Sequence, residues 1–250
     1  MTTETLQENV YLRPLSGAEV TTPPPALAPA RIKLEGEYVV LEPMRSDQHA
    51  EALYQASHDS EQGLKIWDYL AYGPWPDLSS YTAAIKQQSA DPNQIFFALR
   101  CKASNEVCGQ ASFLDINPIN GVIEIGHIWF GPQLQKTQAA TEALYLMIRY
   151  AMDDLGYRRM QWRCNSLNEN SRSAAGRLGF RFEGIFYNHM IFKGKNRDTA
   201  WYSILDNEWP VVRELIESWL AKDNFDVEGR VINSLSQMIQ HRGADAWSRT

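Results

Sequence analysis

The chain has 250 residues, of which 44% are hydrophobic and 22% charged, and this composition is typical of a globular protein. Its formal net charge of −6 argues against a nucleic-acid partner, because phosphate backbones are bound by basic surfaces. We expect a cytoplasmic protein without a membrane partner, because no apolar run approaches the roughly 18 residues of a transmembrane helix and the N-terminus lacks the apolar stretch of a secretory signal.

The first elements in chain order are an irregular arm, a strand pair and two helices. Residues 1–30 include TTPPPALAPA, whose prolines resist helix and sheet, so we interpret them as a flexible Pro-rich arm that cofactor binding does not need. The folded part is expected to begin at RIKLEGEYVVLEPM with two short strands. DQHAEALYQASH has the pattern of a helix, with Ser46 or Asp47 as its N-cap. An aromatic loop, IWDYLAYGPWPD, precedes a second helix, LSSYTAAIKQQSA.

From residue 94 the hydrophobic pattern becomes that of strands. Three strands are predicted at QIFFALRCK, EVCGQASFLDIN and GVIEIGHIWF. The loop GPQLQK then leads into a long amphipathic helix that ends at Gly156. RRMQWRCN is predicted to be a strand and NSRSAAGRLG a short helix. FRFEGIFYNHMIF and RDTAWYSIL are predicted to form a hairpin, followed by a terminal helix, NEWPVVRELIESWLAK, and a weakly patterned tail.

This order predicts one mixed α/β domain over residues 31–208, with a C-terminal helix and tail over residues 209–250. Cys101, Cys108 and Cys164 are odd in number and lack a CxxC spacing, which favours reduced thiols over disulfides. The histidines form no close-spaced pattern, so we predict no metal site. The protein is expected to be a monomer or a homodimer.

Three stretches in this order carry a family resemblance: IEIGHIWFGPQLQKTQAATEA, CNSLNENSRSAAGRLGF and EGIFYNHMIFKGKNRDTAWYSIL. Over about residues 31–208 the chain resembles the GNAT superfamily of acetyl-CoA-dependent N-acetyltransferases, and within it the RimJ/RimL-like branch. The resemblance implies a mixed α+β fold, whose central, mostly antiparallel sheet is splayed at the cofactor site and has helices on both faces. It also implies an acyltransferase that uses acetyl-CoA and no metal. The acceptor would be a primary amine, from a peptide N-terminus or a small molecule, that attacks directly.

In this family a loop with the pattern Gln/Arg-x-x-Gly-x-Gly/Ala binds the coenzyme A pyrophosphate through backbone N–H groups. The matching residues here are Gln135, Lys136, Thr137, Gln138, Ala139 and Ala140, so Gln138 replaces the central glycine. A helix N-terminus attracts anions because its first N–H groups are unpaired, and a non-glycine residue in helical conformation still offers its N–H group. Taken alone, the hexapeptide favours a plain capped helix; the flanking motifs favour the phosphate cradle.

The resemblance also assigns residues to the pantetheine arm of the cofactor. The backbone of Ile128, Trp129 and Phe130 lies where the family's strand splays, and Asn168 begins the motif Asn-x-x-Ser. A buried strand end is the alternative for the first three residues, and a helix cap is the alternative for Asn168.

Acetyl transfer needs a neutral amine, which a general base supplies by taking a proton from the ammonium form. Glu124 is the first candidate, because it is an acid within the otherwise apolar strand VIEIGHI; a solvent-facing strand residue is the alternative. His127 and His189 are further candidates, although structural hydrogen bonding is the more common role of histidine. The glutamate of RimL-like members on the penultimate strand is replaced here by Met190.

The leaving thiolate must be protonated, and many family members use a tyrosine seven residues after the motif asparagine. That position is Ala175 here, so the tyrosine is absent. The serine that RimL-like members are thought to use maps onto Ser171. We take Ser171 as the candidate acid, with water as the alternative proton source.

Aromatic residues in the loop IWDYLAYGPWPD and in the last hairpin are candidates for substrate binding, because they offer large planar contact surfaces. They are Trp67, Tyr69, Tyr187 and Trp201. Core packing is the alternative for each of them. Two other functions stay open: a coenzyme A-binding module that has lost catalysis, and a protein-interaction domain whose Pro-rich arm is the docking segment.

Overall fold

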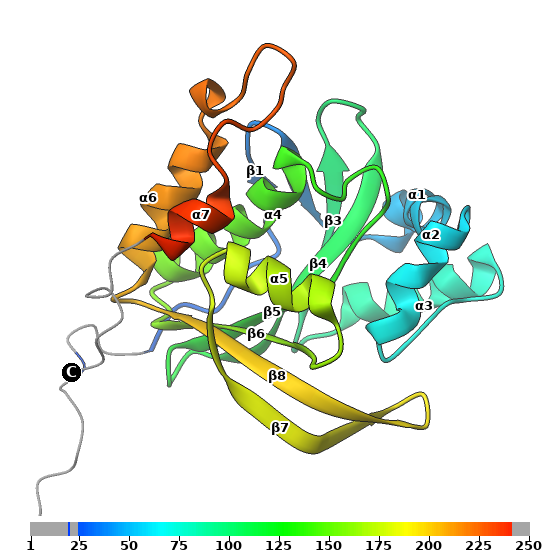
Figure 1. Cartoon of the computed structure of the whole chain (residues 1–250). Helices are drawn as coiled ribbons and strands as arrows, with labels where there is room; N and C mark the ends of the chain where they lie inside the picture. The colour runs from blue at the N-terminus through cyan, green and yellow to red at the C-terminus, as the bar shows by residue number, and fades with distance from the viewer. Residues whose placement is uncertain (1–19, 21–24, 242–250) are drawn as a thin grey trace, which may run out of the picture.

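The computed structural model describes Val20 and residues 25–241 as one sheet with helices on both of its faces (Figure 1). The sheet has eight strands in the order β1-β2-β3-β4-β5-β6-β8-β7. Neighbouring strands are antiparallel except β5 and β6, which run parallel. The strands are β1 Leu34–Glu35, β2 Val39–Pro43, β3 Ile95–Cys101, β4 Val107–Asn117, β5 Val122–Phe130, β6 Arg159–Asn165, β7 Arg181–Phe192 and β8 Lys195–Leu205. The predicted mixed α+β fold with a mostly antiparallel sheet is confirmed.

The helices form two groups (Figure 1). The first group is α1 Ser46–His58, α2 Glu61–Leu64 and α3 Leu78–Ala90, and the second is α4 Gln138–Arg149, α5 Glu169–Arg177, α6 Trp209–Leu220 and α7 Leu235–Gln240. Two of them, α2 and α7, are not predicted from the sequence. Within the described residues, no helix combines the length and the apolar character that crossing a membrane requires.

The central strands of the sheet are buried on both faces, and each face has its own hydrophobic cluster. In β3, Phe97 and Leu99 belong to the cluster that includes residues of α4, α6 and α7. Phe96 and Ala98 belong to the cluster that includes residues of α1 and α3. Successive strand residues point to opposite faces, so a strand buried on both sides has the continuous apolar pattern that β3 shows.

Helix α1 begins one residue before the predicted segment and uses a different cap. Neither Ser46 nor Asp47 caps it, so that prediction is wrong: the N-cap residue is Arg45, whose side chain makes no capping hydrogen bond. Instead the Arg45 N–H donates to Nδ1 of the buried His49 at 3.0 Å. A side chain of the first helical turn therefore satisfies the backbone that precedes the helix.

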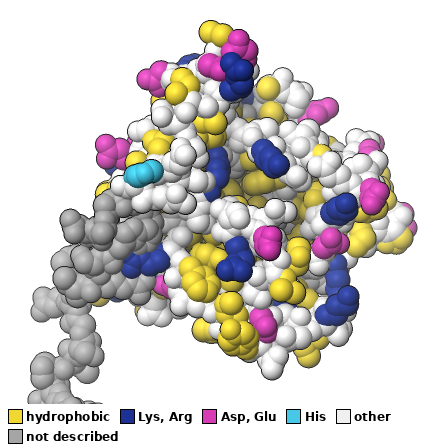
Figure 2. All heavy atoms as spheres, in the orientation of Figure 1, with side chains coloured by type: hydrophobic (Ala, Val, Ile, Leu, Met, Phe, Trp, Pro, Cys, Tyr) yellow, Lys and Arg dark blue, Asp and Glu magenta, His cyan; other side chains and the backbone are white. Residues whose placement is uncertain are grey.

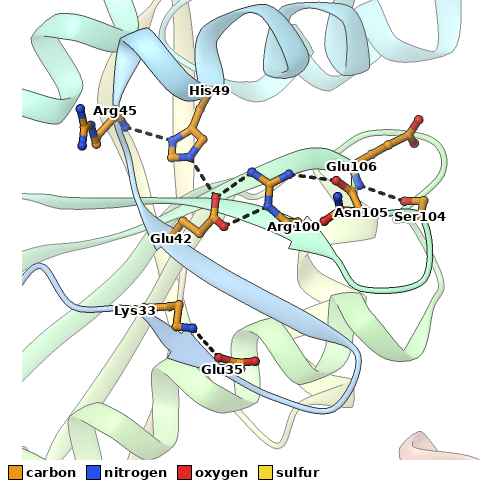
Figure 3. Close-up of polar contacts among 9 residues, drawn as sticks. All are labelled: Lys33, Glu35, Glu42, Arg45, His49, Arg100, Ser104, Asn105 and Glu106. Atoms are coloured by element: carbon orange, nitrogen blue, oxygen red, sulfur yellow. Dashed lines mark hydrogen bonds and ion pairs between the residues drawn. The ribbon is translucent and has the colours of Figure 1, made fainter.

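The same histidine ties α1 to the sheet (Figure 3). His49 Nε2 lies 3.0 Å from Glu42 Oε2, and Arg100 donates to both oxygens of Glu42 at 2.9 and 3.0 Å. Arg100 also donates to the Asn105 carbonyl in the β3–β4 turn at 2.9 Å. The Arg100 guanidinium holds the pKa of Glu42 below its usual value. This network fixes β2, β3 and α1 relative to one another.

The β1–β2 turn is attached to α4 by one buried carboxylate. Glu142 accepts hydrogen bonds from the N–H groups of Glu37, Tyr38 and Val39 at 2.7, 2.6 and 3.0 Å. Gly36 makes room for it, because a Cβ at this position would lie 2.3 Å from the carboxyl carbon of Glu142. The glycine is therefore required by the close approach of the turn to α4.

The long helix ends differently from the prediction. It changes at Tyr150 into a π-helical turn, Tyr150–Asp154, in which the Leu155 N–H donates to the Tyr150 carbonyl at 3.1 Å. Gly156 follows with φ of 76°, so it terminates the whole segment as predicted.

Both ends of the described chain are folded onto the domain. Residues 1–19 and 21–24 of the predicted arm lie outside the described residues, but residues 25–30 are attached: the Ala26 N–H donates to Pro118, Leu27 to Leu155 and Ala30 to the Tyr150 hydroxyl. In the C-terminal tail, α7 buries Leu235 and Ile239. Two apolar residues four apart are too weak a pattern to predict a six-residue helix.

Candidate active site

The only parallel strand pair in the described sheet, β5 with β6, is short. β5 and β6 pair at Val122 with Arg159, Ile123 with Met160 and Glu124 with Gln161, and at no later residue. β5 nevertheless continues to Phe130, and along its other edge it stays paired with β4 up to Gly109 opposite Phe130. The edge of β5 beyond Glu124 therefore offers backbone groups that β6 does not use.

Three residues predicted to bind the pantetheine arm, Ile128, Trp129 and Phe130, lie on this open part of β5. The Trp129 side chain packs in the cluster beneath α1 and α3, while Ile128 and Phe130 pack against the other cluster. The Phe130 carbonyl accepts from the Gln135 side chain at 2.9 Å. Gln135 therefore anchors the loop to the strand end, and only the remaining backbone groups of the open edge are free for a ligand.

The N-terminus of α4 adjoins this edge, because the loop after Phe130 leads directly into it. Thr137 is the N-cap, and its hydroxyl accepts from the Ala140 N–H at 3.1 Å. The N–H groups of Gln138 and Ala139 have no hydrogen-bond partner among the described residues. Lys136, with φ of 61°, is exposed just before the cap. Two unpaired N–H groups and a cation are suited to bind phosphate.

Helix α5 approaches the opening from the side of β6. Asn168 is its N-cap and accepts from the Ser171 N–H at 3.1 Å, so the cap interpretation of Asn168 is confirmed. The Ser171 hydroxyl accepts from the Trp162 indole N–H at 3.0 Å. Figure 2 shows the surface hollowed between α4 and α5, with hydrophobic side chains in the hollow and Lys or Arg side chains at its rim.

Glu124 is a buried carboxyl group at the last paired position before the strands diverge. Its residue is 3% exposed, and it forms an ion pair with Arg163 of β6, which also pairs with Asp115 of β4. Burial raises the pKa of Glu124 to about 7; Asp115 adds to the rise, and Arg163 opposes it. The predicted solvent-facing alternative is wrong, because this face of β5 is covered.

His127 lies at a bulge of β5, with φ of 51°, where the register with β4 shifts. Tyr72 stacks on its ring and places its hydroxyl 2.8 Å from Nδ1. Burial lowers the pKa of His127 to about 4, so the imidazole is neutral at neutral pH. His189 is exposed on β7, with Nδ1 3.0 Å from the Thr199 hydroxyl.

The four aromatic residues predicted to bind substrate lie in different environments. Trp67 is 1% exposed and packs against Trp75 and Trp129 in the core, which favours core packing, the alternative role given for it, over contact with an acceptor. Tyr69 is exposed, and its hydroxyl donates to the Leu167 carbonyl at 3.2 Å, which joins the loop after α2 to the start of α5.

The other two lie on the last hairpin. Tyr187 on β7 is 75% exposed. Trp201 on β8 is half-buried, and the Arg163 guanidinium lies 4.9 Å above its ring. The hairpin also reaches the first group of helices, because Lys193 donates to the Trp67 carbonyl at 2.7 Å. Trp201 therefore lies next to the Glu124–Arg163 pair, and Tyr187 lies apart from it in exposed surface.

Sequence reasoning missed Arg163 and Arg197. Arg163 faces the same side of the sheet as Glu124, because Gln161 pairs with Glu124 and strand residues two apart share a face. Arg197 contributes to the electrostatic shifts of both Glu124 and His127. Alternation within RRMQWRCN indicates which residues share a face, but only knowledge that β5 and β6 are neighbours would have brought Arg163 to Glu124.

The cysteines are free thiols, as predicted, with Cys108 and Cys164 buried. Across Val20 and residues 25–241, no group of histidine, cysteine and acidic side chains has the arrangement of a metal site. The chemical groups gathered where β5 and β6 diverge are the carboxyl group of Glu124, the hydroxyl group of Ser171 and the N-terminus of α4.

Comparison with known proteins gives one family. Residues 39–181 match the model of the acetyltransferase (GNAT) domain. The crystal structure of a GCN5-related N-acetyltransferase from Brucella melitensis is 42% identical and superposes with a TM-score of 0.84, over 87% of this chain and 98% of that one. YdaF of Bacillus subtilis (strain 168), named as a candidate ribosomal N-acetyltransferase, is 29% identical over 68% of this chain and 91% of its own length.

A further solved structure, the microcin C7 self-immunity acetyltransferase MccE in complex with acetyl-CoA and AMP, shares the fold. It is 24% identical with a TM-score of 0.58, over 68% of this chain and 93% of that one.

Proposed function

This chain belongs to the acetyltransferase (GNAT) family and is an acyltransferase, and we propose that it transfers the acetyl group of acetyl-CoA to a primary amine by direct attack of the amine. The acceptor is a small-molecule amine or a peptide N-terminus. The observation that carries the proposal is the divergence of β5 from β6 immediately after Glu124, beside the unpaired N–H groups of α4.

The residues around this opening suit acetyl-CoA. The N–H groups of Gln138 and Ala139, with Lys136 nearby, would hold the pyrophosphate. The open edge of β5 would hydrogen-bond the amide groups of the pantetheine arm, as an added strand does. MccE, which shares this fold, is a protein with bound acetyl-CoA. When bound, acetyl-CoA supplies an activated thioester whose carbonyl carbon accepts the amine.

Glu124 is the proposed general base. With a pKa of about 7 it is deprotonated in a substantial fraction of molecules at neutral pH, and it can take a proton from an ammonium group directly or through water. Arg163 fixes its orientation through their ion pair. His127 is less suited, because its pKa of about 4 makes it a weak base and Tyr72 occupies its Nδ1.

Ser171 is the proposed donor to the departing sulfur. Its oxygen accepts from Trp162, so its own O–H stays available to donate. The hydroxyl lies on the α5 side of the opening, opposite Glu124 on the sheet. Asn168 fixes the start of the helix that carries Ser171.

Two measurements test the proposal. Acetyl-CoA should raise the melting temperature, because a ligand that binds the folded state stabilises it. Acetyl-CoA turnover should then depend on an amine when a mixed amine library is supplied, and mass spectrometry of the products should identify the N-acetylated compound.

The outcomes separate three functions. Binding with amine-dependent turnover supports the transferase. Binding without turnover of any amine indicates a coenzyme A-binding module without catalysis, and no binding indicates an interaction domain.

A further inference from the structure

Arg197 of β8 is a partly buried cation without an anionic partner among the described residues. Its Nε is buried and has no hydrogen-bond partner, whereas its two terminal nitrogens keep contact with solvent. The guanidinium lies 4.3 Å from the centre of the Phe192 ring, which supports it from one side. The planar end of the side chain is therefore held in place and open to a ligand.

Arg197 lies on the face of the sheet that carries the candidate active site. Residues two apart along a strand share a face, so Arg197 and Trp201 point to the same side of β8. Trp201 pairs with Arg163, whose guanidinium contacts both Trp201 and Glu124. The charge of Arg197 acts on Glu124 and on His127. An acceptor amine at Glu124 would therefore lie within the reach of this cation.

The charges of the site favour an acceptor that carries a negative group. Arg163 is already neutralised by its contacts with Glu124 and Asp115, while Arg197 has no such contact. When Glu124 and Asp115 are both ionised, their two negative charges balance the two positive charges of Arg163 and Arg197, so the net charge of the group is zero. A simple ammonium would add a positive charge next to Arg163 and Arg197, whereas an amine with an attached carboxylate would add no net charge, and one with an attached phosphate would add a negative charge.

Burial of an unpaired cation is unfavourable, and burial lowers the pKa of Arg197. Two other partly buried arginines of the described chain are paired with carboxylates, Arg100 with Glu42 and Arg159 with Glu183. Arg177 has no carboxylate partner in the described chain but donates a hydrogen bond to the Thr141 hydroxyl at 3.0 Å. A guanidinium that is kept without a protein partner is matched in shape and charge to a carboxylate or phosphate, which it binds through two parallel hydrogen bonds.

We propose that Arg197 binds an anionic oxygen group, a carboxylate or a phosphate, that a small acceptor amine carries close to its amino group. This inference rests on the proposed transferase function and specifies the acceptor class. Phe192 forms an apolar wall beside the guanidinium, Trp201 packs against the neighbouring Arg163, and Glu124 receives the amino group. Arg197 acts on acceptor specificity as a binding residue.

The experiment compares acceptors in matched pairs that differ in the anionic group. The pairs are L-alanine with L-alaninamide, for a carboxylate, and O-phosphoethanolamine with ethanolamine, for a phosphate. Acetyl-CoA turnover is measured with wild type, Arg197→Gln and, as a control, Arg149→Gln, which removes an exposed arginine of α4. Arg197→Lys, which keeps the charge, is a second variant in case Arg197→Gln does not fold.

In wild type and Arg149→Gln, kcat/KM should be about tenfold or more higher for the anionic member of at least one pair, and the pair that responds identifies the group. Arg197→Gln should abolish this preference mainly through KM for the anionic member, with the acetyl-CoA affinity unchanged. Arg197→Lys should keep part of the preference.

Equal kcat/KM within both pairs in wild type, or a preference that persists in Arg197→Gln, would overturn the proposal. If no amine is acetylated, the transferase function fails separately. Calorimetric titration of the same pairs in the presence of coenzyme A then decides the inference: preferential, Arg197-dependent binding of an anionic member supports it, and equal or absent binding rejects it.

Discussion

Two titratable side chains lie close together on β5, the buried Glu124 and the partly buried His127, and burial moves their pKa values in opposite directions. A buried carboxyl group is harder to ionise, so the pKa of Glu124 rises to about 7. A buried imidazole is harder to protonate, so the pKa of His127 falls to about 4. At neutral pH only Glu124 therefore changes its protonation state. This contrast distinguishes a candidate base from a structural histidine.

Glu124→Gln should lower kcat/KM by about 10²–10⁴-fold near neutral pH, because the amide keeps the shape and cannot take a proton. The wild-type rate should rise with pH through about 7, as Glu124 loses its proton, and this step should be absent in the variant. The difference should shrink at high pH, where the amine is already neutral. The measurement is kcat/KM against pH for both proteins.

Acetyl-CoA affinity is the control, because Glu124 is not assigned to cofactor binding. Parallel pH profiles of kcat/KM less than about tenfold apart would show that Glu124 is not the general base, and His127 and His189 would then be the next candidates for that role.

Single residues were predictable from the sequence only where their chemistry contrasts with their surroundings. Glu124 stands out as an acid among apolar strand residues, and it proves to be buried. Arg163 and Arg197 do not stand out, because each lies in a strand with other polar residues, and their significance comes from strand neighbours distant in sequence. The burial of Trp67 was not predictable, because an aromatic residue in a loop pattern gives no sign of whether the loop is buried.

At the scale of single elements, the N-terminus of α4 is the proposed phosphate site. Ala140→Glu should weaken acetyl-CoA binding about tenfold or more, because it places a negative charge and extra volume in the first turn. Because Ala140 is buried, Gln138→Glu serves as a second variant that adds the charge at a partly exposed position. Calorimetry with acetyl-CoA provides the measurement.

Gln87→Glu is the matched control, since it adds the same charge to an exposed position of α3. If both α4 variants bind acetyl-CoA as wild type does while keeping its melting temperature, the phosphates bind elsewhere.

The attachment of the β1–β2 turn to α4 depends on Glu142. Glu142→Ala should reduce the free energy of unfolding by about 2–3 kcal/mol, because three backbone N–H groups lose their charged acceptor. Urea denaturation measures this, with Glu214→Ala on the exposed face of α6 as a control expected to stay within about 0.5 kcal/mol of wild type. Similar losses in the two variants would show that the hydrogen bonds add little.

Most strands and long helices were predictable because each has a clear hydrophobic period. The exceptions have physical causes: α7 has too few residues to show a period, and the π-helical turn at Tyr150–Asp154 depends on backbone bonds that side-chain type does not specify. The parallel pairing of β5 with β6, which creates the opening, was available only through the family resemblance, because the sequence does not state which strands are neighbours.

At the scale of the whole molecule, residues 25–30 belong to the fold and connect separate elements of it. A protein lacking residues 1–30 should melt lower than one lacking residues 1–24, by about 2 °C or more, because it loses three hydrogen bonds and the buried Ala26. Both should bind acetyl-CoA equally well, since these contacts lie on Pro118, Tyr150 and Leu155 and not on the proposed cofactor residues. Equal melting temperatures would show that the contacts contribute no stability.

The central claim is that an amine attacks acetyl-CoA directly at the opening between β5 and β6, without an acetylated protein group. The most direct test incubates the protein with acetyl-CoA labelled in the acetyl group, with and without the amine identified by turnover, and follows the label and the released coenzyme A. The account predicts that coenzyme A release requires the amine and that all transferred label is on the amine. Label on Cys164 or Ser171, or release at the same rate without amine, would contradict it.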